Sequence, residues 1–87
     1  MTSPRAPRAR LDARPYACPM SWVKTRVALD RLAEGEVLEV LLAAGPSADD
    51  VPRTAAEDGH VVLAIEPVAG DAVRVLLEKG PPAPELP

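Results

Sequence analysis

The feature that most constrains the fold of this chain is an aliphatic run at residues 36–43, Glu-Val-Leu-Glu-Val-Leu-Leu-Ala. The run has the length of a β-strand, and Gly45 and Pro46 end it. A strand that is apolar at nearly every position is normally covered by other elements of the fold. We therefore expect residues 36–43 to form a strand that is covered on at least one face.

The segment before this strand has the periodicity of a helix. Pro19 suits the first helical position, where a missing N–H costs nothing, and Gly35 supplies the stop. The spacing of the apolar residues predicts a helix from Pro19 to about Ala33. The side chains on its inward face would be Trp22, Thr25, Leu29 and Leu32.

A second, shorter helix is expected at about residues 48–58, with Gly59 just past its end. Ser47 can cap this helix, and Asp50 is a competing cap because Pro52 fits only a first turn. The side chains expected to point inward are Val51 and Ala55.

Three further segments have the character of strands. Residues 11–15 form a short extended segment, whereas residues 61–66 and 73–78 alternate between two faces. Hairpin-turn chemistry at residues 69–71, Ala-Gly-Asp, predicts that the last two strands pair antiparallel. The order β-α-β-α-β-β predicts an α+β fold: a two-layer α/β sandwich with a mixed four-stranded sheet and two helices on one face.

The length of 87 residues fits one domain. Prolines and arginines indicate a flexible tail at residues 1–9, and prolines indicate a second one at residues 80–87, so that the folded domain should span residues 10–79. The sequence contains neither an apolar run of membrane-spanning length nor a signal-peptide core. We expect a cytoplasmic protein without a membrane partner.

Composition excludes several classes of function. The chain has no Phe, one Trp and one Tyr, and its net charge is -3, so it lacks both the aromatic platform and the basic field of a nucleic-acid-binding protein. With one Cys and one His it can form neither an internal disulfide nor a recognisable metal-ligand cluster. We therefore expect no metal, no cofactor and no direct contact with nucleic acid.

Cys18 is the side chain best placed to act as a nucleophile. It directly precedes the first predicted helix, whose positive dipole end favours a thiolate. Arg14 and Lys24 are candidates for a nearby cation, and residues 13–29 contain no Asp or Glu. The alternative is a lone cysteine buried as a small apolar residue, and periodicity does not decide between the two.

Several short motifs occur in a characteristic order: Leu11-Asp12-x-Arg14-x-x-x-Cys18-Pro19, then Glu34-Gly35-Glu36-Val37-Leu38, Asp50-Val51-Pro52, Gly59-His60 and Leu77-Glu78-Lys79-Gly80. Taken together, the set resembles the TusA/SirA-like sulfur-carrier family. The resemblance implies that Cys18 accepts a sulfane sulfur as a persulfide from a donor protein of the cysteine desulfurase or rhodanese type. It also implies that Cys18 passes the sulfur on to an acceptor protein.

The chain departs from the usual family motif, Cys-Pro-x-Pro with an often acidic x, because it reads Cys18-Pro19-Met20-Ser21. Ser21 lacks the ring that stiffens the first turn, although its hydroxyl can bond locally. Met20 removes a carboxylate that would disfavour the thiolate, so Cys18 should be more acidic than its relatives. The acceptor could differ from that of the tRNA-thiolating members.

Other residues have weaker claims to a function. Met20, Val23 and Val27 form an outward apolar stripe that starts beside Cys18, and it serves either to dock a partner or to pack against the amino-terminal tail. Asp12 and Arg14 either orient the loop that carries Cys18 or pair on the surface. His60 is expected to be an exposed or capping residue.

The sequence therefore leaves two candidate functions. The first is a sulfur carrier or sulfurtransferase with Cys18 as the persulfide acceptor, supported by Pro19, Asp12, Arg14 and Lys24. The second is a non-catalytic interaction or regulatory module on the same scaffold, which uses the outward stripe and transfers no sulfur.

Overall fold

The computed structural model describes residues 6–17 and 19–81, and Cys18 lies outside them. The elements follow in the order predicted from the sequence, with two helices and four strands. Their bounds are β1 Ala9–Asp12, α1 Met20–Asp30, β2 Val37–Ala43, α2 Pro46–Glu57, β3 Val61–Val68 and β4 Ala72–Glu78.

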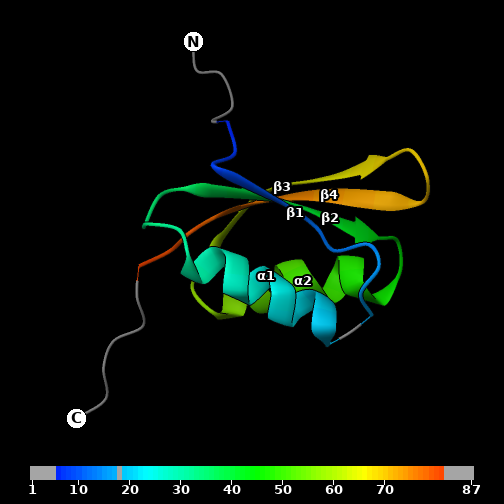
Figure 1. Ribbon diagram of the computed structural model, residues 1–87, viewed down its shortest axis with the longest axis horizontal. Coiled ribbons are helices and arrows are strands. Elements are labelled where there is room, and N and C mark those ends of the chain that lie inside the picture. Colours follow the sequence, from blue (N-terminus) through cyan, green and yellow to red (C-terminus); the bar gives the residue numbers. More distant parts are fainter. Residues whose placement is uncertain (1–5, 18, 82–87) are drawn as a thin grey trace.

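The strands form one sheet in the order β1-β2-β4-β3. β1 runs parallel to β2, and β4 runs antiparallel to both of its neighbours, β2 and β3. The tight turn between β3 and β4 holds Gly70 at φ +85° and Asp71 at φ +52°, conformations that Gly and Asp adopt more readily than most residues. Figure 1 shows both helices on the same face of the sheet, so the predicted two-layer α+β sandwich is confirmed.

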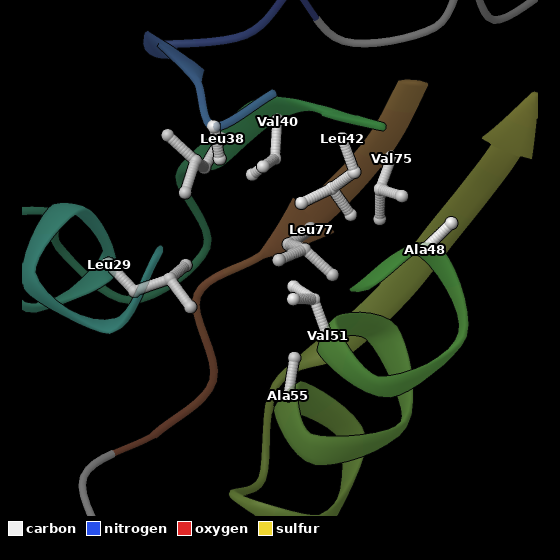
Figure 2. Close-up of a cluster of buried hydrophobic side chains, with 10 residues drawn as sticks. Leu29, Leu38, Val40, Leu42, Ala48, Val51, Ala55, Val75 and Leu77 are labelled. Atoms are coloured by element: carbon white, nitrogen blue, oxygen red, sulfur yellow. The ribbon is translucent and has the colours of Figure 1, made fainter. Parts of the chain in front are cut away.

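The core lies between the sheet and the two helices (Figure 2). Its largest side chains are fully buried: Leu38, Val40 and Leu42 of β2, Val75 and Leu77 of β4, Leu29 of α1 and Val51 of α2. Trp22 and Leu32 pack against this cluster but are only partly buried. Each buried aliphatic side chain contributes about 1.5–3 kcal/mol, which explains how the fold is stable without an aromatic core.

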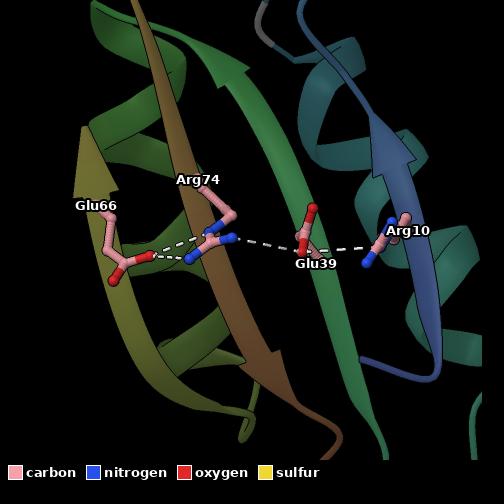
Figure 3. Close-up of polar contacts among 4 residues, drawn as sticks. All are labelled: Arg10, Glu39, Glu66 and Arg74. Carbon is pink, nitrogen blue, oxygen red and sulfur yellow. Dashed lines mark hydrogen bonds and ion pairs between the residues drawn. The ribbon is translucent and has the colours of Figure 1, made fainter. Parts of the chain in front are cut away.

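The open face of the sheet carries a row of charged side chains, one from each strand (Figure 3). Arg10 Nε lies 3.8 Å from Glu39 Oε1, and the same oxygen lies 4.0 Å from a guanidinium nitrogen of Arg74. Arg74 Nε donates a hydrogen bond of 3.0 Å to Glu66, and this bond is the main reason that the pKa of Arg74 is raised. We call these residues the charge row.

Helix α1 ends at Asp30, earlier than the periodicity predicted. The expected continuation to Ala33 is wrong because other parts of the chain bind the last turn. Lys79 Nζ donates to the carbonyl of Leu29 at 3.0 Å, and the N–H of Ala33 donates to Glu36 Oε1 at 2.8 Å. The residues around the end of this helix are therefore bound both by a distant side chain, Lys79, and by a local one, Glu36.

Helix α2 begins at Pro46, with Gly45 as its N-cap residue and no side-chain cap among the described residues. The prediction that Ser47 or Asp50 caps it is wrong. Ser47 is buried inside the first turn, and Asp50 accepts a hydrogen bond of 2.5 Å from Arg53 in the next turn. Neither side chain therefore caps the backbone N–H groups at the start of the helix.

Pro52 lies in the interior of α2, where only a first-turn position was expected. A proline inside a helix removes one backbone hydrogen bond and costs about 3 kcal/mol. Its ring is buried, beside a groove between α2 and β3. Burial of this apolar ring offsets part of that cost.

Strand β3 contains a bulge that interrupts the alternation expected from the sequence. Val62 pairs with Leu77 and Ile65 pairs with Val75, so four residues of β3 match three residues of β4. The extra residue is Leu63, which lies in the register shift. As a result, Val62 and Ile65 both face the helices. Strict alternation would place these two residues on opposite faces, because they are three positions apart.

Candidate functional site

The start of helix α1 is open to solvent and free of acidic side chains. Ala17, Pro19 and Met20 are all exposed. The N–H of Ser21 donates to the carbonyl of Ala17, and that of Val23 donates to Pro19, both at 3.1 Å. The described residues provide no side-chain cap here, and the first turn contains no carboxylate. The predicted nucleophile, Cys18, lies outside the described residues, between two of these exposed neighbours.

Asp12 and Arg14 form a bidentate ion pair in the turn after β1. Arg14 Nε donates to one carboxylate oxygen of Asp12 at 2.8 Å and its second nitrogen donates to the other at 2.7 Å. The backbone N–H of Arg14 also donates to this carboxylate, at 3.1 Å. These bonds lower the pKa of Asp12 to about 2 and raise that of Arg14.

The pair is a surface feature, because both side chains are about half exposed. Of the two roles that the sequence left open, surface pairing is therefore observed directly. The backbone bond of Arg14 also fixes the turn that leads toward position 18. Because Asp12 compensates its charge, Arg14 is a weaker candidate for a cation beside a thiolate than the sequence suggested.

Lys24 is the other predicted cation. Its ammonium lies 5.3 Å from the centre of the Tyr16 ring, a cation–π geometry that joins α1 to the segment before position 18. Within residues 6–17 and 19–81, Lys24 makes no ion pair. Its positive charge is therefore not cancelled by a carboxylate there.

Met20, Val23 and Val27 form the outward stripe that the sequence predicted, and we call it the α1 stripe. Their exposed fractions are 45%, 42% and 45%. Tyr16, 36% exposed, adds an aromatic side chain from the preceding segment. The stripe therefore presents an apolar surface of one helix to solvent, beginning two residues after position 18.

A buried contact between the two helices was missed by sequence reasoning. Ser21 Oγ donates to Ser47 Oγ at 3.1 Å, and Ser21 is fully buried. The carbonyl of Ser21 also accepts a hydrogen bond of 2.8 Å from Thr25 Oγ1. The Ser21 hydroxyl, for which the sequence suggested a local bond, has a partner 26 residues away in the described part of the chain. The contact ties the first turn of α1 to the first turn of α2.

His60 connects the end of α2 to the end of β4 and takes no part in this arrangement. Its Nδ1 accepts a hydrogen bond of 3.0 Å from the N–H of Gly80. Partial burial, followed by the charge of Lys79, lowers its pKa. A side chain at Gly80 would come within 1.9 Å of the Gly59 carbonyl, so this junction is tightly packed.

In the described part of the chain, no cluster of three or more His, Cys, Asp or Glu side chains could hold a metal ion. None of the helices there combines the length and the apolar character needed to cross a membrane.

Comparison with known proteins gives consistent matches. A family model described as "Sulfurtransferase TusA" matches residues 9–79. A "Putative sulfur carrier protein" of Archaeoglobus fulgidus is 35% identical over 69 residues, which cover 79% of this chain and 78% of the relative. "Putative sulfur carrier protein YedF" of Escherichia coli strain K12 is 36% identical over 73 residues, covering 84% of this chain and 94% of YedF.

The fold also matches a solved structure. The crystal structure of a SirA-like protein from Desulfitobacterium hafniense superimposes with a TM-score of 0.73 and 23% sequence identity. The match covers 84% of this chain and 99% of the other. At this level of identity the likeness concerns the fold.

Proposed function

This chain belongs to the TusA family, and on that premise we propose that it is a sulfur carrier that holds sulfane sulfur as a persulfide on Cys18. The observation that carries the proposal is the extent of the family match. It runs from residue 9 to residue 79 and includes every helix and strand together with the only cysteine of the chain.

The proposed reaction needs one thiol and no cofactor. The Cys18 thiolate attacks the outer sulfur of a donor persulfide, and the donor leaves as a thiolate. The outer sulfur, with its proton, is then bonded to Cys18 as a new persulfide. A nucleophile of the acceptor attacks the same sulfur in the second step, and Cys18 leaves as the thiolate it was at the start.

The surroundings of position 18 support a reactive thiolate. Backbone N–H groups at a helix start favour a negative charge nearby. The first turn of α1 contains no carboxylate to oppose it, since Met20 occupies the position that is often acidic in the family. Lys24, held against Tyr16, adds a positive charge on the same helix.

The remaining site residues receive supporting roles in this proposal. Pro19 is the N-cap residue of α1, and the bidentate pair of Asp12 and Arg14 fixes the turn that leads toward it. The α1 stripe docks the partners, a sulfur donor of the cysteine desulfurase or rhodanese type and an acceptor protein. We propose a cytoplasmic location, since a carrier thiol functions in its reduced state and the cytoplasm keeps thiols reduced.

The exposed α1 stripe also suits the alternative, an interaction module that carries no sulfur. Incubation with a persulfide donor, followed by intact-mass measurement, separates the two functions. We expect the wild type to gain one sulfur atom and the Cys18→Ser variant to gain none. The sulfur-carrier proposal fails if the wild type gains no sulfur, or if the added sulfur persists in the Cys18→Ser variant.

A further inference from the structure

The large exposed hydrophobic side chains of the described residues gather in two places. One is the α1 stripe with Tyr16. The other lies on β3, at an edge of the sheet, where we call it the β3 surface. It consists of Val61, Leu63, Ile65 and Val68, whose exposed fractions are 49%, 42%, 54% and 36%. Ile65 pairs with Val75 and faces the helix layer, whereas Val61 and Val68 pair with Glu78 and Ala72 on the open face of the sheet. The sulfur-carrier proposal has no use for this second surface.

On the helix side of the sheet, at Ile65, the β3 surface adjoins a groove of about 400 Å³ between α2 and β3. Its apolar lining consists of Ala48, Pro52 and Ala56 from α2 with Val62 and Ile65 from β3. Ile65 is more than half exposed although it faces the helix layer.

Two opposite charges line the same groove. Asp49 and Arg53 lie one helical turn apart on α2. Arg53 binds Asp50, whereas Asp49 makes no ion pair within the described residues. If two copies of α2 meet antiparallel about a twofold axis, Asp49 of each copy faces Arg53 of the other. The groove is therefore self-complementary in charge.

We propose that the groove and Ile65, the member of the β3 surface that borders it, form a symmetric interface with a second copy of this chain. Ile65 of each copy lies against the small residues of the other copy's groove, and Asp49 and Arg53 pair across the twofold axis. This proposal does not depend on sulfur transfer.

Side chains, rather than paired strands, hold this dimer together. Edge strands that contain a bulge or a proline resist backbone pairing with another sheet, and β3 contains both, at Leu63 and Pro67. The contact is consequently limited in area, and small interfaces are typical of weak, reversible association. We expect a dimer that forms and dissociates with protein concentration.

The arrangement leaves the proposed carrier site of each copy free. Among the described residues, helix α1 packs on α2, β1 and β2 and has no contact with β3, which is the opposite edge of the sheet. A dimer through β3 and α2 therefore keeps both α1 stripes on outer surfaces. The open face of the sheet is a poorer interface, because the charges of the charge row already neutralise one another.

Sedimentation equilibrium of the full chain over a range of concentrations tests the proposal. We expect the mean mass of the wild type to rise reversibly toward twice the monomer mass. Ile65→Asp should remain monomeric, whereas the control Val27→Asp, at a similarly exposed aliphatic position on α1, should dimerise like the wild type. Thermal unfolding of each variant reports whether it is folded.

A charge exchange gives a test that does not disturb the apolar surface. Asp49→Arg and Arg53→Asp, made singly, should each weaken the dimer about tenfold, since each places like charges opposite one another in both halves of the interface. The double variant should restore the dimer, because the exchange keeps the two charges complementary. A wild type that stays monomeric at the highest concentration overturns the proposal. So does a dimer that both single variants and Ile65→Asp leave unchanged.

Discussion

The α1 stripe and the β3 surface are both exposed and aliphatic, but they differ in what surrounds them. The α1 stripe begins beside an open helix start and a cysteine, and the positive charge of Lys24 lies next to it. At Ile65, the β3 surface adjoins a groove whose lining includes one acid and one base, Asp49 and Arg53. An exposed apolar surface therefore indicates a function only together with the charged and reactive side chains around it.

The largest effect should come from a change that affects both surfaces at once. Leu38 is fully buried in the core beneath both helices. Leu38→Ala should lower the free energy of unfolding by about 2–5 kcal/mol, because it leaves a cavity in a packed core. Urea unfolding measures this loss. A loss below about 1 kcal/mol would mean that the core can collapse around the site.

A matched pair of variants should separate the two surfaces. Val23→Asp places a charge in the α1 stripe and should slow sulfur loading of Cys18 by about tenfold or more, since it disturbs partner docking and opposes a nearby thiolate. Ile65→Asp should leave the loading rate unchanged. Each variant is incubated with the donor protein, samples are quenched over time, and intact mass gives the loading rate. Equal slowing by both variants would contradict the separation.

A smaller effect is expected from a charge placed at position 20, the first residue of the α1 stripe. Met20→Glu places a carboxylate in the first turn, where the wild type has none. It should lower the thiolate fraction of Cys18 and slow its alkylation by iodoacetamide at neutral pH several-fold. Met20→Gln is the control of equal size and should react like the wild type. Equal rates for the two variants would place Cys18 outside the influence of this turn.

The smallest effect concerns the pair beside β1. The pKa of Asp12 is lowered from 3.8 to about 2, so its contribution to stability is present above pH 4 and is lost as the pH falls through about 2. The stability difference between the wild type and Asp12→Asn should therefore shrink over this acidic range. Unfolding midpoints measured from pH 2 to pH 6 test this. A difference that is independent of pH would contradict the pairing.

Much of the fold could be predicted because its signals are local. The helix period around Leu29 and the turn residues at Gly70 depend on neighbours in the sequence, and the structure confirms both. The end of α1 and the bulge at Leu63 could not be predicted in this way. Lys79, 50 residues away in sequence, binds the last turn of α1, and the bulge is defined by pairing with β4.

The candidate site likewise contains features that depend on local sequence and features that depend on distant residues. Cys18 and the α1 stripe follow from residues that are close in sequence, and the exposure of the stripe is confirmed. The contact between Ser21 and Ser47 joins two helices, and nothing in either local sequence indicates it. The groove likewise arises where small residues of α2 meet β3, so it becomes visible only when the two elements are placed together.

The charge row has a consequence for the fidelity of folding. Because adjacent residues of a strand point to opposite faces, a slip of one residue in any strand would turn its member of the row toward the helices. Arg10, Glu39, Glu66 or Arg74 would then enter an aliphatic interior, and burying an unpaired charge there is prohibitive. The same slip would turn the leucines and valines of the inner face out to solvent. The charged outer face and the aliphatic inner face therefore reject the same misaligned sheets.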